Sequence, residues 1–295
     1  MLPDLLLATG PEPTRGAALQ WARQVIDRLD ARLLLQFVAG CTPSDLLAYP
    51  ERPLTDEAAT RYAALVARRQ HGEPLAYLTG EAGFYGDLLQ VSPAVLVPRP
   101  ETEELVAWAL DLLVGCDAPT IADLGTGSGA IALALAGARC DAQVLAIDLS
   151  PDAVAVATAN RDRLGRQNVG IRCANWLDDT AADPVFDLIV SNPPYIDAAD
   201  PHLAGDGVRY EPRLALTDGG NGLSAYVAIV AQAVPRLTPG GWLLVEHGHD
   251  QAVAVAQLWA AAGLTQIESR RDLSGNPRMT AGRKPGSTGA HHGAD

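Results

Sequence analysis

The sequence predicts an α/β protein with a mostly parallel, seven-stranded sheet covered by helices on both faces, preceded by a small all-α helical domain. From Thr120 onward, strand-like and helix-like runs alternate, as they do in parallel sheets with two covered faces. Residues 1–80 show only helical periodicity. The length of 295 residues leaves room for two domains.

The helical part, residues 1–80, contains four predicted helices. Small and aliphatic side chains recur in it at three- and four-residue spacings, which places them on one face of a helix. The predicted helices are Arg15–Leu29, Arg32–Val38, one capped by Thr42-Pro43 that ends at Pro50, and one from Thr55 to about Arg69. This part shows no catalytic constellation.

Residues 81–97 are predicted to form a β-hairpin that links the two domains, because the composition changes there to Gly, aromatic and β-branched residues. Its two strand-like runs lie at Phe84-Tyr85 and Leu88–Val91. Pro98 and Pro100 then fix an extended approach to a helix that begins at Glu101 and runs to about Val114.

The sheet belongs to a predicted domain of residues 98–284. Its strands are Ile121–Leu124, Gln143–Asp148, Gly170–Cys173, Phe186–Ser191, Gly241–Glu246, Leu264–Glu268 and Arg278–Gly282. The helices between them include Ile131–Ala138 and one that begins at Ser150-Pro151, where Ser is the cap and Pro the first helical residue. The Gly-rich residues 285–295 have no periodicity and are predicted to be a disordered tail.

Composition excludes several classes of function. The formal net charge of −13 opposes nonspecific binding of a phosphate backbone, so no nucleic-acid partner is expected. No apolar run reaches the ~18 residues of a membrane helix, and Leu2–Ala8 lacks the basic segment of a signal peptide. We therefore expect a cytoplasmic protein without a membrane partner.

Cysteines and histidines give no support for a metal site. Cys41, Cys116, Cys140 and Cys173 are far apart and form no CxxC pair, which is typical of small buried side chains in a reducing compartment. The histidines show no ligand spacing either. No metal is expected.

A glycine-rich loop follows the first strand of the sheet. Its residues are Gly125, Thr126, Gly127, Ser128 and Gly129. Glycines let a ligand approach the backbone, and the N-terminus of the next helix offers free N–H groups to an anion. Asp148 ends the following strand, where a carboxylate can bind both hydroxyls of a ribose. This order predicts a site for an adenosine-containing ligand; the loop alone leaves a nicotinamide dinucleotide and S-adenosylmethionine equally open.

Asn192-Pro193-Pro194-Tyr195 follows the fourth strand and so lies at the same edge of the sheet. The Asn192 side-chain oxygen and the Pro193 carbonyl can accept the two hydrogens of an NH₂ group and turn its lone pair toward an electrophilic methyl. The prolines hold these acceptors rigidly, and Tyr195 offers a flat wall for a planar amide or base. We therefore predict Asn192, Pro193 and Tyr195 as catalytic, and Asn192, Pro193, Pro194 and Tyr195 as substrate-binding.

These motifs resemble those of class I S-adenosylmethionine-dependent methyltransferases, which have a Rossmann-like domain. The helical N-terminal part, Pro98–Glu103 (PRPETE), the NPPY segment, Asp218–Leu223 and Glu246-His247-Gly248 together resemble the release factor glutamine methyltransferase (HemK/PrmC) family across residues 15–284. The resemblance implies S-adenosylmethionine as cofactor and the Gly-Gly-Gln glutamine of class 1 peptide chain release factors as substrate. The helical domain would then recognise that substrate.

Site roles follow from the same resemblance. The cofactor-binding residues would be Gly125, Thr126, Gly127, Ser128, Gly129, Asp148, Trp176 and Asn192. Trp176 would lie by the adenine, and Asn175 stands where relatives often have Asp. Arg99 and Glu101 would shape the rim of the active site.

Three other functions fit part of the pattern. An adenine amino-methyltransferase on DNA or RNA would use the same NH₂ geometry on a flipped base, but the acidic composition opposes it. A nicotinamide-dependent oxidoreductase leaves the NPPY segment without a role. A noncatalytic binding protein on the same scaffold would require the loss of site residues that are present here.

Overall fold

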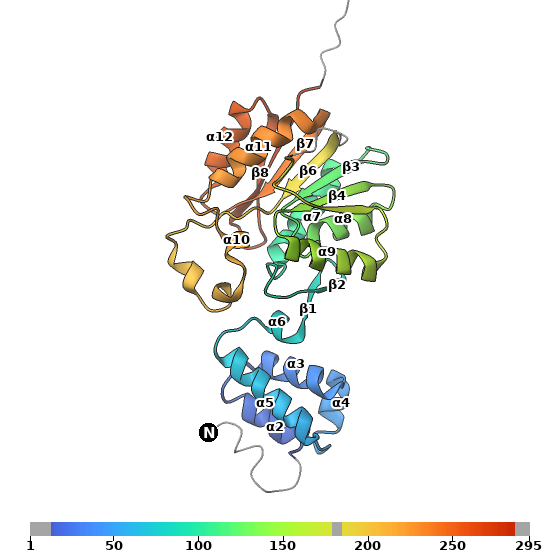
Figure 1. Ribbon diagram of the computed structural model, residues 1–295, viewed down its shortest axis with the longest axis vertical. Helices are drawn as coiled ribbons and strands as arrows, with labels where there is room; N and C mark the ends of the chain where they lie inside the picture. The colour runs from blue at the N-terminus through green and yellow to red at the C-terminus, as the bar shows by residue number, and fades with distance from the viewer. Residues whose placement is uncertain (1–12, 179–184, 287–295) are drawn as a thin grey trace, which may run out of the picture. The chain divides into compact units, whose positions relative to one another are not determined.

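The computed structural model describes residues 13–178 and 185–286, which form two compact units (Figure 1). One unit contains the described residues up to Glu81 together with Ala204–Tyr210, and the other contains Ala82–Leu203 and the residues from Glu211 onward. The apolar start at residues 2–8 and all but 285 and 286 of the predicted tail lie outside the described residues.

The first unit is helical, as predicted. Its helices are α2 (Arg15–Ala22), α3 (Arg28–Ala39), α4 (Pro43–Ala48), α5 (Asp56–Gln70) and α6 (Leu75–Thr79). Leu34, Leu35 and Tyr62 are fully buried in its core, where the Tyr62 hydroxyl donates to the Ala31 carbonyl at 2.8 Å. Thr42 and Thr55 cap α4 and α5 as the sequence indicates.

The predicted continuous helix Arg15–Leu29 is wrong. Helix α2 ends at Ala22, and α3 begins at Arg28 because the Asp27 side chain accepts a hydrogen bond from the Leu29 amide and caps the new helix. Val25 and Ile26 are half-buried and pack against the helical core from the turn between the two helices. Val25 and Ile26 therefore continue the apolar spacing of α2, although they lie in a turn and not in a helix.

The second unit contains a two-stranded hairpin and the seven-stranded sheet. The strands are β1 (Glu81–Phe84), β2 (Asp87–Gln90), β3 (Thr120–Leu124), β4 (Gln143–Asp148), β5 (Val169–Cys173), β6 (Phe186–Ser191), β7 (Leu237–Glu246), β8 (Thr265–Arg271) and β9 (Pro277–Arg283). The sheet order is β5-β4-β3-β6-β7-β9-β8; β5 to β7 are parallel, and β9 pairs antiparallel with both β7 and β8. The predicted α/β class and seven strands are confirmed.

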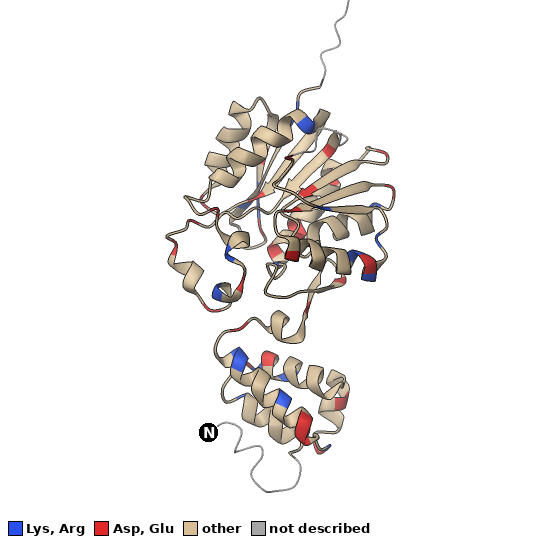
Figure 2. Cartoon of the chain, in the orientation of Figure 1, with Lys and Arg blue, Asp and Glu red and all other residues tan. Residues whose placement is uncertain are grey.

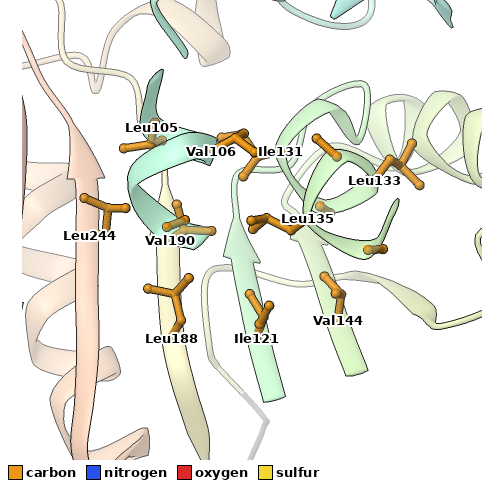
Figure 3. Packing of buried hydrophobic residues seen from close by; sticks show 14 of the residues in the cluster. Leu105, Val106, Ile121, Ile131, Leu133, Leu135, Val144, Leu188, Val190 and Leu244 are labelled. Carbon is orange, nitrogen blue, oxygen red and sulfur yellow. The ribbon is translucent and has the colours of Figure 1, made fainter. Parts of the chain in front are cut away.

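Helices cover both faces of this sheet. The helices of the second unit are α7 (Pro100–Leu112), α8 (Ala130–Ala138), α9 (Pro151–Leu164), α10 (Arg213–Leu216), α11 (Ser224–Arg236) and α12 (Ala252–Ala261). Of two short 3₁₀ turns, Pro201–Ala204 belongs to this unit except for its last residue, and Val208–Tyr210 belongs to the first unit. Figure 3 shows β3, β4, β6 and β7 turning aliphatic side chains toward α7 and α8. On the other face, Tyr226 of α11 and Trp259 of α12 are fully buried. Burial of apolar side chains on both faces stabilises the sheet, and the loops that follow its strands are left at its edges.

The cysteines differ from prediction, because none of the four is buried. Cys41 and Cys116 are half-buried, while Cys140 follows the end of α8 and Cys173 ends the edge strand β5, so both are exposed.

Candidate active site

The carboxyl ends of the neighbouring strands β3, β6 and β7 lie side by side at one edge of the sheet. Leu124 of β3 pairs with Ser191 of β6, and Ser191 pairs with Val245 of β7. The Ser191 hydroxyl donates to the Leu124 carbonyl at 2.6 Å, which ties the first two ends together. The next residues along each chain, Gly125 and Asn192 among them, therefore leave the sheet side by side. This is also where the strand order reverses between β3 and β6, the place at which open α/β sheets bind ligands.

A cavity lies at this edge of the second unit. Its lining includes eight of the predicted site residues: Gly125, Thr126, Gly127, Ser128, Asp148, Trp176, Asn192 and Pro194. Arg99, Thr102 and Asn175 also line it. Gly129, Pro193 and Tyr195 are not among its lining residues. The glycine loop and the NPPY segment, 63 or more residues apart in the chain, thus share one cavity.

Asp148 holds the glycine loop in shape. Its two carboxylate oxygens accept the Gly127 amide at 2.8 Å and the Ser150 amide at 2.9 Å. Burial raises the pKa of Asp148, and these amide hydrogen bonds oppose that rise. Each carboxylate oxygen can accept a second hydrogen bond, so Asp148 can still bind hydroxyl groups inside the cavity that it lines.

Trp176 covers the start of the loop. A Cβ atom on Gly125 would lie 3.5 Å from the Trp176 ring, so the ring rests directly against the glycine backbone. Trp176 itself has a φ of 51°, a left-handed conformation that costs a residue with a side chain about 1–3 kcal/mol. The Asn175 amide beside it donates to Asp178 at 3.1 Å. Trp176, which follows the end of β5, therefore lines the cavity next to Gly125.

Asp123 places a buried carboxylate beneath the glycine loop. One oxygen accepts the Thr126 hydroxyl at 2.6 Å and the Ala132 amide at 3.2 Å, whereas the other has no hydrogen-bond partner in the described part of the chain. Burial raises the pKa of Asp123 to about 7. Asp123 does not line the cavity, so its hydrogen bonds act on the shape of the glycine loop from behind it.

The NPPY segment is held from three directions. The Asn192 side-chain NH₂ donates to the Thr102 hydroxyl at 3.2 Å, the Gln251 amide donates to the Tyr195 carbonyl at 3.0 Å, and the Tyr195 hydroxyl donates to Glu246 at 3.4 Å. The Tyr195 ring packs against the core between the sheet and α11. Its predicted role as a wall for the substrate therefore stays a prediction.

In the sequence, Thr102 and Glu246 stand out only as parts of the longer motifs Pro98–Glu103 and Glu246-His247-Gly248. The Thr102 hydroxyl donates to Glu246 at 2.7 Å, and both side chains are buried. The available signal was an acidic residue at the carboxyl end of a buried strand, Gly241–Glu246. Arg99 forms an ion pair of 2.6 Å with the buried Glu211 and lines the cavity, as expected of a rim residue, whereas Glu101 is exposed and does not line it.

Charge is mixed over the chain. Figure 2 shows Lys and Arg on several elements of each unit, interspersed with Asp and Glu. Across residues 13–178 and 185–286, no three His, Cys, Asp or Glu side chains gather in a way that would hold a metal ion, and no helix has the length and apolarity needed to cross a membrane.

Known proteins resemble this chain over nearly its whole length. Residues 17–80 match the PrmC N-terminal domain, and residues 108–258 match the methyltransferase small domain. The release factor glutamine methyltransferase of Salmonella typhimurium is 48% identical over 256 residues, covering 87% of this chain and 92% of the relative. That of Burkholderia pseudomallei is 46% identical over 285 residues, covering 94% and 99%.

A solved structure supports the fold. The 16S rRNA N2 G1207 methyltransferase of Thermus thermophilus, determined with AdoMet and guanosine, has a TM-score of 0.52 and 18% identity, covering 69% of this chain and 49% of that one. The two family domains, the identity to the curated relatives and the fold all agree on the family. The chain belongs to the release factor glutamine methyltransferase family.

Proposed function

We propose that this protein transfers a methyl group from S-adenosylmethionine to the side-chain amide nitrogen of the glutamine in the Gly-Gly-Gln motif of class 1 peptide chain release factors. The observation that carries the proposal is the shared cavity of the glycine loop and Asn192 at adjoining strand ends. It supports the proposal because the residues expected to bind the cofactor lie beside Asn192, one of the two acceptors proposed for the substrate amide.

The residues of the cavity fit S-adenosylmethionine. Gly125 to Gly129 would hold its methionine part, Asp148 its ribose and Trp176 the adenine, with Asn192 at the methyl end. When bound, the cofactor supplies an electrophilic sulfonium methyl.

The chain's own residues would position the amide. Its lone pair is delocalised, so an amide nitrogen attacks poorly unless it is held and oriented. The Asn192 side-chain oxygen and the Pro193 carbonyl accept its two hydrogens, and Pro194 limits their movement. Holding reactants in an attack geometry can contribute several kcal/mol to lowering the barrier.

This arrangement favours an amide over a carboxylic acid. A glutamate would bring oxygen acceptors against two acceptors and leave all of them unpaired. Adenine offers an NH₂ of similar geometry, but the net charge of −13 opposes approach to nucleic acid. The helical unit would provide the docking surface for the release factor, and the site of action would be the cytoplasm, where translation factors work.

Transfer of labelled methyl from S-adenosylmethionine tests this function. We expect label on a class 1 release factor, and none on its Gln→Ala variant or on duplex DNA. Label on the DNA, or an unlabelled release factor, would refute the proposal.

Replacing Asp148 by alanine should weaken S-adenosylmethionine binding. Lost hydrogen bonds to a charged group cost about 1.5–3 kcal/mol, which raises Kd by about tenfold to a hundredfold. Titration calorimetry measures this change directly. Asp152→Ala, an exposed carboxylate in the first turn of α9, is the control and should bind normally; equal Kd values for the two variants would contradict the role of Asp148.

A further inference from the structure

Three polar side chains form a chain of hydrogen bonds behind the reacting group. Glu246 accepts the Thr102 hydroxyl at 2.7 Å, and Thr102 in turn lies 3.2 Å from the Asn192 side-chain nitrogen. Thr102 is 4% exposed and Glu246 is 3% exposed. They come from α7, β7 and the end of β6, so the tertiary fold assembles the chain.

The chemistry of the three groups gives the chain a direction. An ionised carboxylate only accepts hydrogen bonds, so the single Thr102 hydrogen must point to Glu246. The Thr102 oxygen is then left with lone pairs alone and can only accept. The Asn192 group that faces Thr102 must therefore be its NH₂, and the Asn192 oxygen is turned the other way.

We propose that Thr102 and Glu246 are positioning residues that orient the Asn192 amide, so that its oxygen and not its NH₂ meets the substrate nitrogen. The proposal rests on the methyl-transfer function proposed above, because only an NH₂ substrate needs an acceptor at this place. In the reverse orientation, the Asn192 NH₂ would face the NH₂ of the substrate, and two donors cannot hydrogen-bond to each other.

The surroundings of Glu246 make this orientation depend on pH. Burial, with a smaller contribution from the charge of Glu101, raises the pKa of Glu246 to about 7, although hydrogen bonds from Thr102 and Tyr195 and the positive charge of Arg278 act to lower it. On the remaining sides, the Tyr226 hydroxyl of α11 donates to the Glu246 backbone carbonyl, and the neighbouring His247 has a pKa lowered by burial.

Protonation of Glu246 would reverse the chain. A neutral carboxyl can donate its proton to the Thr102 oxygen, and the Thr102 hydroxyl hydrogen is then free to point toward Asn192. The Asn192 amide would turn so that its oxygen accepts this hydrogen. Below pH 7 the Asn192 oxygen would therefore face Thr102, and above pH 7 it would face the substrate nitrogen. The rate should accordingly rise with pH through a midpoint of about 7.

Matched substitutions of Thr102 test the orientation. Thr102→Val keeps the shape and removes the hydroxyl, and we expect kcat to fall by about tenfold to a hundredfold with the KM for the release factor and the Kd of S-adenosylmethionine nearly unchanged. Thr102→Ser keeps the hydroxyl and should retain activity. An unchanged kcat in Thr102→Val, or an equal loss in Thr102→Ser, would overturn the proposal.

Glu246→Gln tests the pH dependence. Its side-chain oxygen can still accept from Thr102 but does not titrate, so the fall of kcat below pH 7 should vanish. A fall that persists in Glu246→Gln would overturn the proposal.

An NMR measurement without turnover separates this inference from the proposed function. In protein labelled with ¹⁵N-asparagine, the Asn192 side-chain NH₂ signal, assigned by its loss in Asn192→Ala, should titrate near pH 7 in the parent protein and not in Thr102→Val. If release factors were no substrate, turnover would be absent in every variant while this titration remained. The same titration in both proteins would overturn the orientation role.

Discussion

Replacing Asn192 by alanine is expected to lower kcat by about 10²–10³-fold, the range seen when one aligned hydrogen-bonding group is removed from a reacting centre. The Asn192 side-chain oxygen is one of the two acceptors proposed to hold the substrate NH₂. Alanine removes this oxygen and also the side-chain nitrogen that donates to Thr102. The Kd of S-adenosylmethionine should change by only a few-fold, because the glycine loop and Asp148 stay in place. Single-turnover rates and titration calorimetry measure the two effects separately.

A matched variant guards against a general loss of structure. Asn276 is an exposed asparagine in the turn between β8 and β9 and does not line the cavity. Asn276→Ala should methylate at the parent rate. A rate in Asn192→Ala equal to the parent rate, or a loss explained wholly by weaker cofactor binding, would contradict the positioning role.

Replacing Gly222 by alanine is expected to reduce kcat by about 10²-fold, because displacing a positioned group by ~1 Å can cost that much. A Cβ atom on Gly222 would lie 2.1 Å from the Tyr195 carbonyl oxygen and 2.9 Å from the Gln251 side-chain nitrogen that binds this carbonyl. The NPPY segment must therefore shift to admit the methyl group.

Gly219 in the same loop offers the matched control. Gly222 and Gly219 have φ values of 76° and 80°, so alanine at either position pays a similar penalty of about 1–2 kcal/mol for the left-handed conformation. A Cβ on Gly219 meets nothing within 4 Å. Gly219→Ala should thus lose some thermal stability and keep its kcat. Equal kcat values for the two variants, with both folded by circular dichroism, would contradict the steric argument.

Much of the second unit is predictable because its signals are local. Strands Gln143–Asp148 and Phe186–Ser191 are bounded by turn residues and were predicted to the residue. Ser150 and Pro151 mark the start of α9 for reasons contained in two neighbouring side chains. In the helical unit, by contrast, Val25 and Ile26 continue an apolar spacing through the turn after α2, and this spacing masks the local signal of Asp27, which caps α3.

The site divides in the same way. The glycine loop and Asn192 carry motifs that are visible in the chain, and their meeting follows from the rule that parallel strands end at one edge. Thr102 and Glu246 lie 144 residues apart and meet through the register of β6 and β7 and the packing of α7. The packing of the Tyr195 ring against the core is likewise a tertiary feature, which residue types alone do not reveal.

The position of the transferred methyl group tests the central claim most directly. After reaction with S-adenosylmethionine, a class 1 release factor can be digested and its Gly-Gly-Gln peptide fragmented in a mass spectrometer. We expect a single methyl on the glutamine side-chain nitrogen, and none when that glutamine is replaced by glutamate. A methyl group on a carboxylate, on another residue or on the glutamate variant would contradict selection of an amide NH₂ by Asn192 and Pro193.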